Sequence, residues 1–179
     1  MMHLSPENIT LREAGISDLE KLRQLGKRTF SETFSIYNTE ENMNEYLKTA
    51  FSSEKLLSEL KEAFSKFYFA ELSGQLIGYL KVNFGPAQTD IQDEKSLEIE
   101  RIYVLKEFHG QQVGQLLYDK ALEIAKARNL EFVWLGVWEK NPRAIRFYQK
   151  NGFVVFDKHT FNLGQDPQTD LMMKLTLTN

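Results

Sequence analysis

The chain of 179 residues contains no cysteine, and histidine is scarce. Without cysteine there can be no disulfide, no thiolate nucleophile and no cysteine-ligated metal. The three histidines, His3, His109 and His159, stand too far apart in the sequence to suggest a metal site, so we expect no bound metal. The absence of cysteine also fits a reducing cytoplasm, where we expect the protein to act.

Long apolar runs and a dominant charge are missing as well. No stretch approaches the length needed to span a bilayer, and the N-terminus lacks the apolar core of a signal peptide. The net charge is −3, from 22 basic and 25 acidic residues, and no basic cluster stands out. We therefore expect neither a membrane nor a nucleic acid as partner. A mildly acidic surface suits a cationic small molecule.

The remaining composition is that of an ordinary globular protein, with 42% hydrophobic and 26% charged residues. No repeat or linker divides the chain, which predicts one domain over residues 1–179. Hydrophobic periodicity predicts an α/β domain with a mixed sheet flanked by helices. Strands are expected at 9–12, 67–72, 76–84, 97–104, 132–137, 153–157 and 171–177, helices beginning near 18, 39, 53, 113 and 143, and a mobile loop over 85–95.

A loop with two glycines, His109-Gly110-Gln111-Gln112-Val113-Gly114, joins a predicted strand to a predicted amphipathic helix. Unpaired amides and the helix dipole at such a junction favour an anion such as a pyrophosphate. The alternative is a strand-to-helix turn that needs glycine only for its backbone. A P-loop is excluded because no Gly-Lys-Ser/Thr follows, and the glycine spacing does not fit a Rossmann dinucleotide site.

Tyr148 lies near the end of the next predicted helix, beside Phe147. Its ring could simply pack against the sheet. Alternatively its phenol is a general acid, because an amine that attacks a thioester expels a thiolate, which a phenol within hydrogen-bond reach can protonate. Asn141, at the start of this helix, has the pattern of an N-cap followed by Pro142, which does not prevent a ligand contact.

Glu98 and Glu100 occupy alternate positions of the predicted strand 97–104, which places both on the face opposite Ile99 and Arg101. Carboxylates in a central strand are costly unless they face a cleft, are paired or are hydrogen bonded. They could form ion pairs with a neighbouring lysine or arginine. Alternatively one of them acts through water as a base, because an alkylammonium, with a pKa of about 10.4, must lose a proton before it attacks.

Taken together, these motifs resemble the acetyl-CoA site of the GNAT N-acetyltransferases, most clearly over residues 97–153. The loop pattern of that family, Arg/Gln-x-x-Gly-x-Gly/Ala, falls on residues 109–114, with the last glycine retained and with departures at His109 and Gln112. The second matching segment contains Asn141, Ala144, Phe147, Tyr148 and Gly152.

The resemblance implies a single domain whose central parallel strands splay apart beside a bulge, with acetyl-CoA as cosubstrate and no metal. It implies that Tyr148 is the acid facing the CoA sulfur and that Glu100 is the recurrent strand carboxylate. The implied contacts with acetyl-CoA come from Ile102, Tyr103, Val104, His109, Gly110, Gln111, Gln112, Val113, Gly114, Gln115, Asn141, Ala144 and Phe147.

Within this family the chain is most similar to bacterial spermidine/spermine acetyltransferases of the PaiA type, over residues 41–51, 96–103, 134–141 and 168–172. That likeness implies a polyamine acceptor. A polyamine calls for separated carboxylates along a groove, and the candidates are Glu32, Glu41 and Glu98, beside Phe30, Phe34 and Tyr46. The alternative for Glu32 and Glu41 is that they are ordinary solvated helix charges.

Two other functions stay open. One keeps the chemistry but acetylates a peptide α-amine or a lysine. The other is a pseudoenzyme that binds acyl-CoA and regulates a partner; retention of both Glu100 and Tyr148 argues against it, because a pure binder needs neither an acid nor a base. The sequence does not rank the amines, and it leaves open whether the protein is a homodimer.

Overall fold

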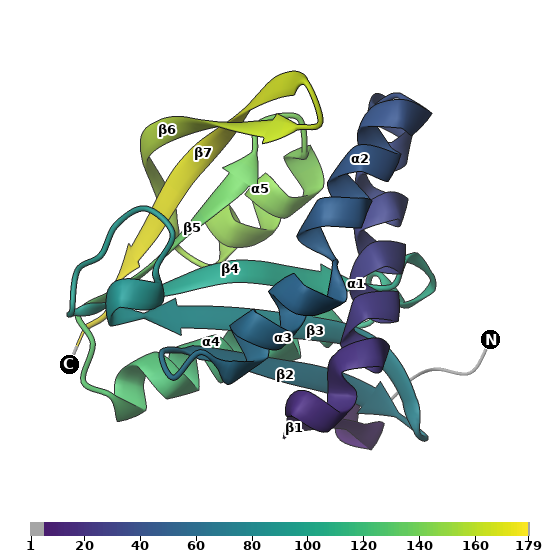
Figure 1. Cartoon of the computed structure of the whole chain (residues 1–179). Helices are drawn as coiled ribbons and strands as arrows, with labels where there is room; N and C mark the ends of the chain where they lie inside the picture. Colours follow the sequence, from purple (N-terminus) through teal and green to yellow (C-terminus); the bar gives the residue numbers. More distant parts are fainter. Residues whose placement is uncertain (1–5, 179) are drawn as a thin grey trace.

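The computed structural model describes residues 6–178, and in that part of the chain five α-helices flank a sheet of seven strands (Figure 1). His3 lies outside the described residues. The strands are β1 (Ile9–Glu13), β2 (Ser65–Leu72), β3 (Gln75–Phe84), β4 (Ser96–Val104), β5 (Phe132–Trp138), β6 (Val154–Leu163) and β7 (Asp166–Thr176). The helices are α1 (Leu19–Phe34), α2 (Glu40–Ala50), α3 (Ser53–Lys61), α4 (Val113–Ala127) and α5 (Pro142–Lys150). None of these helices is long and apolar enough to cross a bilayer.

The centre of the sheet is a parallel pair, β4 and β5, in the strand order β1-β2-β3-β4-β5-β7-β6. The other neighbouring pairs are antiparallel. β4 and β5 pair only over residues 96–98 and 132–134 although both strands continue, so they diverge toward their carboxyl ends. The mixed sheet and the splayed parallel strands are therefore confirmed, and the sheet opens at its centre.

Side chains alternate across the sheet and build one core on each face. On β3, Leu80 and Val82 belong to the core that α4 covers, where Leu117 is fully buried. Tyr79 belongs to the opposite core, together with Phe67 and side chains of α1, α2 and α3. Figure 1 shows α4 on one side of the sheet and α1 to α3 on the other. Because both faces are covered, most of β3 is buried, including the polar residues Lys81 and Asn83.

Side-chain caps set the start of three helices around the site. Thr39 Oγ1 accepts a hydrogen bond from Asn42 N at 3.2 Å, which confirms the predicted start of α2. Ser52, one residue earlier than expected, caps α3 through Lys55 N. At α5, Asn141 Oδ1 accepts from Ala144 N at 3.2 Å and Pro142 takes the first helical position, as the pattern predicts.

The C-terminal hairpin is longer than the sequence predicts. The strands expected at 153–157 and 171–177 are only the outer parts of β6 and β7, which continue to a turn at Gly164 (φ +62°). The missed residues are mostly polar because β6 is an edge strand that exposes much of its length, so hydrophobicity does not mark them. The register of the hairpin places His159 directly opposite Asp170.

The segment over residues 85–95 is tied to the sheet. Gln88 is buried, and its Oε1 accepts hydrogen bonds from Ser96 Oγ and from the Trp134 indole nitrogen, each at 2.7 Å. The neighbouring Thr89 donates through both its backbone nitrogen and its hydroxyl to Glu98. These contacts hold Gln88 and Thr89 against the sheet, within a segment that composition predicts to be a mobile loop. Buried polar groups in the sheet need partners, and this segment supplies them.

Candidate active site

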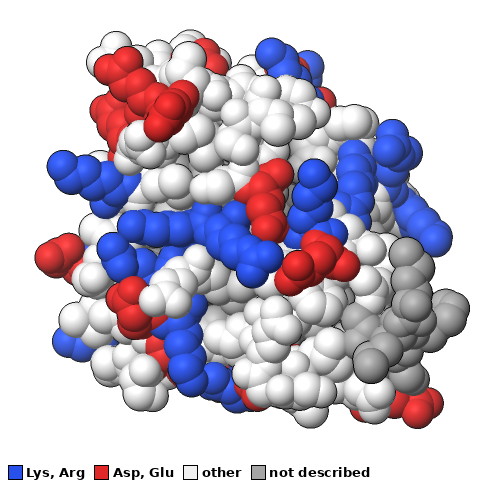
Figure 2. Space-filling view, turned by 90° about the vertical axis from the view of Figure 1, so that its right-hand side faces the viewer, with Lys and Arg blue, Asp and Glu red and all other residues white. Residues whose placement is uncertain are grey.

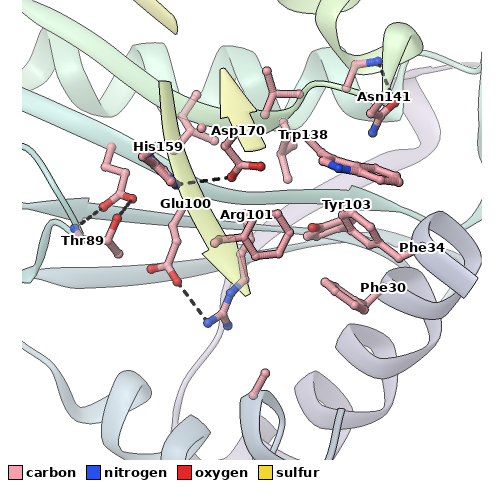
Figure 3. A pocket seen from close by; sticks show the side chains of 18 of the residues that line it. Phe30, Phe34, Thr89, Glu100, Arg101, Tyr103, Trp138, Asn141, His159 and Asp170 are labelled. Atoms are coloured by element: carbon pink, nitrogen blue, oxygen red, sulfur yellow. Dashed lines mark hydrogen bonds and ion pairs between the residues drawn. The ribbon is translucent and has the colours of Figure 1, made fainter. Parts of the chain in front are cut away.

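A cavity of about 290 Å³ lies where β4 and β5 diverge (Figure 3). Aromatic side chains from both helical and strand elements form much of its wall: Phe30, Phe34, Tyr46, Tyr103, Trp138 and Phe161. The fold also brings predicted site residues from distant parts of the sequence into this one lining: Glu98, Glu100, Ile102, Tyr103, Asn141, Ala144 and Tyr148.

A β-bulge at Glu100 shapes the floor of the cavity. Lys81 of β3 pairs with Arg101 whereas Val82 pairs with Ile99, so Glu100 is an extra residue on β4. The bulge implied by the resemblance is therefore present. The predicted alternation is wrong for Arg101, whose guanidinium lies on the same face and donates to Glu100 Oε1 at 3.1 Å.

Glu100 is one of four charged side chains that neutralise one another. Lys81 Nζ lies 2.5 Å from Glu100 Oε2, and Arg101 and Lys81 also pair with Glu59 of α3. Burial opposes the charge on Glu100, but Arg101 and Lys81 outweigh it and lower the pKa of Glu100 to about 2. Of the two interpretations of Glu100, the ion pair is the one that the geometry favours.

Glu98 is buried beside the same floor. Its carboxylate accepts hydrogen bonds from Thr89 N, Thr89 Oγ1 and Asn83 Nδ2, at 2.9, 2.5 and 3.0 Å. Burial raises the pKa of Glu98, and the hydrogen bonds from Asn83 and Thr89 oppose that rise. Glu98 thus anchors the 85–95 segment, and Glu98 itself also lines the cavity.

Tyr148 reaches the cavity from α5, and the packing and functional interpretations of its ring are compatible. The ring packs against Phe147 and Phe153, with centroids 5.3 and 5.6 Å away, and the residue is 5% exposed. Burial raises the pKa of Tyr148, so the phenol stays protonated at neutral pH.

The loop before α4 leaves room over its amides. Gly110 (φ +77°) and Gln112 (φ +65°) are both left-handed, and a Cβ built on Gly110 or Gly114 meets no atom within 4 Å. Packing therefore does not require Gly114, and the open space at a helix N-terminus fits an anion. Gln112 stands where the GNAT pattern has a glycine, and its left-handed conformation, which glycine adopts freely, costs about 1–3 kcal/mol.

The family comparison agrees with this geometry. The profile of the acetyltransferase (GNAT) family matches residues 19–153. The chain belongs to the GNAT acetyltransferase family. It is accordingly an N-acetyltransferase, which confirms the enzyme class predicted from the sequence.

Similar proteins cover nearly the whole chain. An uncharacterized N-acetyltransferase in the pepI 3′ region of Lactobacillus delbrueckii subsp. lactis is 38% identical over 160 residues, 89% of this chain and 92% of that protein. The spermidine N(1)-acetyltransferase of Thermoplasma acidophilum is 27% identical over 154 residues, 84% of this chain and 91% of that protein. The crystal structure of the PaiA N-acetyltransferase of T. acidophilum in complex with coenzyme A has a TM-score of 0.78 and 25% identity, over 94% of this chain and 99% of that chain. The GNAT fold and the likeness to PaiA are confirmed.

His109, the first departure from the GNAT loop pattern, is part of a local contact chain. Its Nε2 lies 2.8 Å from the Val104 carbonyl oxygen, and its Nδ1 contacts the guanidinium of Arg143 from α5. Burial lowers the pKa of His109, so the ring is neutral at pH 7 and Arg143 supplies the positive charge beside the loop. Arg143 was not predicted as a site residue, because only the fold brings the start of α5 against this loop.

Glu32 and Glu41, predicted to bind the acceptor, lie outside the GNAT cavity. Glu32 is on the α1 face away from Phe30, where its carboxylate accepts from Arg28 Nε and Lys106 N. Glu41 is exposed on α2, whose buried face carries Met43. The helices do wall the cavity as predicted, but the helical period turns these two carboxylates away from it.

Two cavity residues escaped the sequence analysis, His159 on β6 and Asp170 on β7. They are cross-strand partners, with Nε2 of His159 3.5 Å from Oδ2 of Asp170. A Cβ on Gly136 of β5 would lie 3.2 Å from His159 Cε1 and 3.3 Å from Asp170 Oδ2, so this glycine makes room for the pair. Asp170 lies in the stretch 168–172 that resembles the PaiA-type enzymes, but its pairing with His159 follows only from the register of the hairpin, counted from the turn at Gly164.

Proposed function

We propose that this GNAT enzyme transfers the acetyl group of acetyl-CoA to a primary amine of a polyamine, such as spermidine or spermine, or of a similar small amine. Acetylation of peptide or protein amines is the alternative acceptor class. The similarity to the spermidine N(1)-acetyltransferase of T. acidophilum supports the polyamine class, and the acceptor side of the cavity supports it independently.

The observation that carries this choice is the closure of the cavity by the C-terminal hairpin. Gln168 Nε2 donates to Asn38 Oδ1 at 2.7 Å, and Gln165 N donates to Asn42 Oδ1 at 3.4 Å. Gly164 packs so closely that a Cβ there would lie 2.7 Å from Asn42 Oδ1. The hairpin is thus joined to the start of α2, which supports a small acceptor over a protein surface.

The lining also matches an extended cation with methylene spacers. Aromatic faces such as those of Phe34 and Trp138, whose ring centroids lie 5.2 Å apart, attract both alkyl chains and ammonium groups. Asp170 adds a buried carboxylate whose Oδ1 has no hydrogen-bond partner in the described part of the chain. On the face shown in Figure 2, acidic and basic side chains are interspersed.

We assign acetyl-CoA to the side of the divergent strands that lies opposite the acceptor side of the cavity. We place its pyrophosphate at the loop of residues 109–114, over the open space at Gly110 and Gly114, with Arg143 beside it. Beyond residue 98 the edge of β4 that faces β5 has no strand partner, so its backbone around Ile102 to Val104 is available to the cosubstrate. The related PaiA structure contains coenzyme A, which supports this assignment.

We assign Tyr148 the role of donor to the leaving thiolate. Its hydroxyl is protonated, lies at the cavity and is held by packing against Phe147 and Phe153. Glu100 contributes a fixed negative charge that orients Arg101 and shapes the floor. A carboxylate with a pKa of about 2 takes up a proton poorly at neutral pH.

An amine panel tests the acceptor class. Thiol release from acetyl-CoA should be fastest with spermidine or spermine, with kcat/KM at least about tenfold above that of a monoamine of similar length, a difference of about 1.4 kcal/mol. The KM of the polyamine should also rise more steeply with salt, since more charges are screened. Glu41→Gln is the matched control, because this exposed carboxylate lies outside the cavity and should change neither KM. Turnover of peptide amines without turnover of any polyamine would reject the proposal.

Gly114→Glu tests the cosubstrate site. A glutamate in the first turn of α4 should keep or raise the melting temperature, because anions there stabilise a helix by about 0.3–1 kcal/mol. Acetyl-CoA affinity, measured by calorimetry, should fall at least about tenfold through repulsion and lost space. Gly114→Ala, which the GNAT pattern allows, is the control. Unchanged affinity in the glutamate variant would place the pyrophosphate elsewhere.

A further inference from the structure

The carboxylates on the cavity floor are badly placed to accept a proton. Glu100 already accepts from Lys81, Arg101 and Asn83, and Glu98 is occupied in the same way by Thr89 and Asn83. An amine acceptor arrives as an ammonium, with a pKa of about 10.4, and must lose a proton before it can attack. Another group at the cavity has to receive that proton.

We propose that Asp170 is the general base that takes a proton from the acceptor ammonium, with His159 positioning its carboxylate. The proposal rests on the proposed amine acceptor. Both residues line the cavity on the side opposite the floor of β4, and Figure 3 shows the imidazole of His159 directed at the carboxylate of Asp170. The pair is built into the sheet, since the two residues face each other across the β6–β7 hairpin and Gly136 leaves them space.

Asp170 has the free oxygen that the floor carboxylates lack. Its Oδ1 is buried and has no hydrogen-bond partner among residues 6–178, whereas Oδ2 faces His159. Burial raises the pKa of Asp170 to about 6, and His159 partly offsets that rise. Such a group is ionised at pH 7 and yet accepts a proton far more readily than an exposed carboxylate, which is the balance that general bases need.

His159 is held between two carboxylates. Its Nδ1 lies 3.3 Å from Asp90 Oδ2 in the 85–95 segment, opposite its contact with Asp170. This arrangement places the ring between the hairpin and that segment. The other charged or titratable groups that line the cavity around the pair are Tyr46 from α2, Lys55 from α3, Glu98, Glu100, Arg101 and Tyr103 from β4, and Tyr148 from α5.

The proposed step balances its protons. The ammonium R–NH3⁺ gives one proton to Asp170, and the freed lone pair forms the C–N bond with the thioester carbonyl carbon. The C–S bond then breaks, and the thiolate receives the second proton through the Tyr148 hydroxyl. The amide keeps one hydrogen, and Asp170 returns its proton to solvent.

Asp170→Asn is the decisive variant, because it keeps the shape of the side chain and removes the base. With a monoamine that the wild type accepts, kcat/KM should fall about 100-fold or more at pH 7 while acetyl-CoA affinity stays unchanged. The loss should shrink as the pH rises toward the amine pKa, because more of the amine then arrives already deprotonated. Wild-type kcat/KM should decline below about pH 6, where Asp170 is protonated, and the variant should not show that decline.

His159→Gln tests the positioning role. Because His159 lowers the pKa of Asp170, its removal should move the acidic decline of kcat/KM to higher pH. If His159 had only a structural role, its removal would change the rate without shifting the pH at which kcat/KM declines. Asp157→Asn, an exposed carboxylate on the same strand, is the control and should leave the pH profile as in the wild type.

Three results would overturn the proposal. Unchanged turnover of Asp170→Asn at pH 7 would show that no base is lost. A loss that persists undiminished at pH 9 to 10 would show a structural defect. If Asp170→Asn raised the KM of spermidine but left the kcat/KM of the monoamine unchanged, Asp170 would bind the distal ammonium group of the polyamine and would not be the base. If the wild type accepts only lysine peptides, the polyamine proposal fails, yet the same pH test of Asp170 can be run with that amine.

Discussion

Tyr148→Phe should lower single-turnover acetyl transfer by about 10²–10⁴-fold, the usual contribution of a positioned acid. The phenylalanine ring keeps the packing against Phe147 and Phe153, so the folded structure and the acetyl-CoA affinity should be nearly unchanged. The only group removed is the hydroxyl of a residue that lines the cavity. Single-turnover kinetics are the proper measurement, because slow product release would mask a loss of chemistry.

Tyr118→Phe is the matched control for that experiment. Tyr118 is equally buried, packs edge-on against Phe147 and Phe153, and has a pKa that burial raises to about 12, but it does not line the cavity. Its variant should turn over like the wild type. If both variants, or neither, lose acetyl transfer, the Tyr148 hydroxyl is not the specific donor.

Lys81→Met should lower the free energy of unfolding by about 3–5 kcal/mol, because it leaves a buried carboxylate short of a partner. Lys81 is 5% exposed and joins Glu100 to Glu59. Arg101 pairs with both carboxylates, and Lys55 Nζ lies 3.9 Å from Glu59 Oε1, so Glu100 would keep Arg101 as its cationic partner. Chemical denaturation measures the change in the free energy of unfolding. The dependence of that free energy on denaturant concentration should be compared between variants, because an equal slope shows that the difference is one of stability. Lys66→Met on the neighbouring strand is the control, since the exposed Lys66–Glu13 pair should contribute less than about 1 kcal/mol.

The acid sensitivity of the same variant provides a second measurement. Glu100 has a folded pKa of about 2, lowered from its ordinary value of 4.5. Its stabilising contribution is therefore complete above that ordinary value and is lost as the pH falls toward 2. Removing Lys81 should raise the pKa of Glu100 and shift acid unfolding of the variant to higher pH. Equal acid midpoints for variant and wild type would show that Lys81 does not hold Glu100 in its charged form.

Local patterns identified the parts of the site that depend on contiguous sequence. The caps at Thr39 and Asn141 and the glycine-bearing loop each combine residues within a few positions, so helix starts and the loop could be predicted from their chemistry. The gap between β4 and β5 could be predicted only through the family resemblance. No residue pattern states where two parallel strands stop pairing.

The misplaced residues all depend on register or helix rotation. Arg101 changes face because the bulge at Glu100 is set against β3, which lies earlier in the chain. Glu32 points away from the cavity because the phase of α1 follows its buried phenylalanines. His159 and Asp170, eleven positions apart, meet only through the hairpin register, which a mostly polar edge strand does not reveal.

The cavity walls and the cosubstrate loop come from different parts of the chain. The loop and the helix bearing Tyr148 lie between residues 109 and 148, whereas α1, α2 and the hairpin that close the acceptor side come from the two ends of the sequence. Substitutions in the walls can therefore accumulate without disturbing the machinery for the acetyl donor. Descendants of one such protein can diverge toward new amines while they retain an unchanged donor site, so conservation of the loop among relatives carries little information about what each of them acetylates.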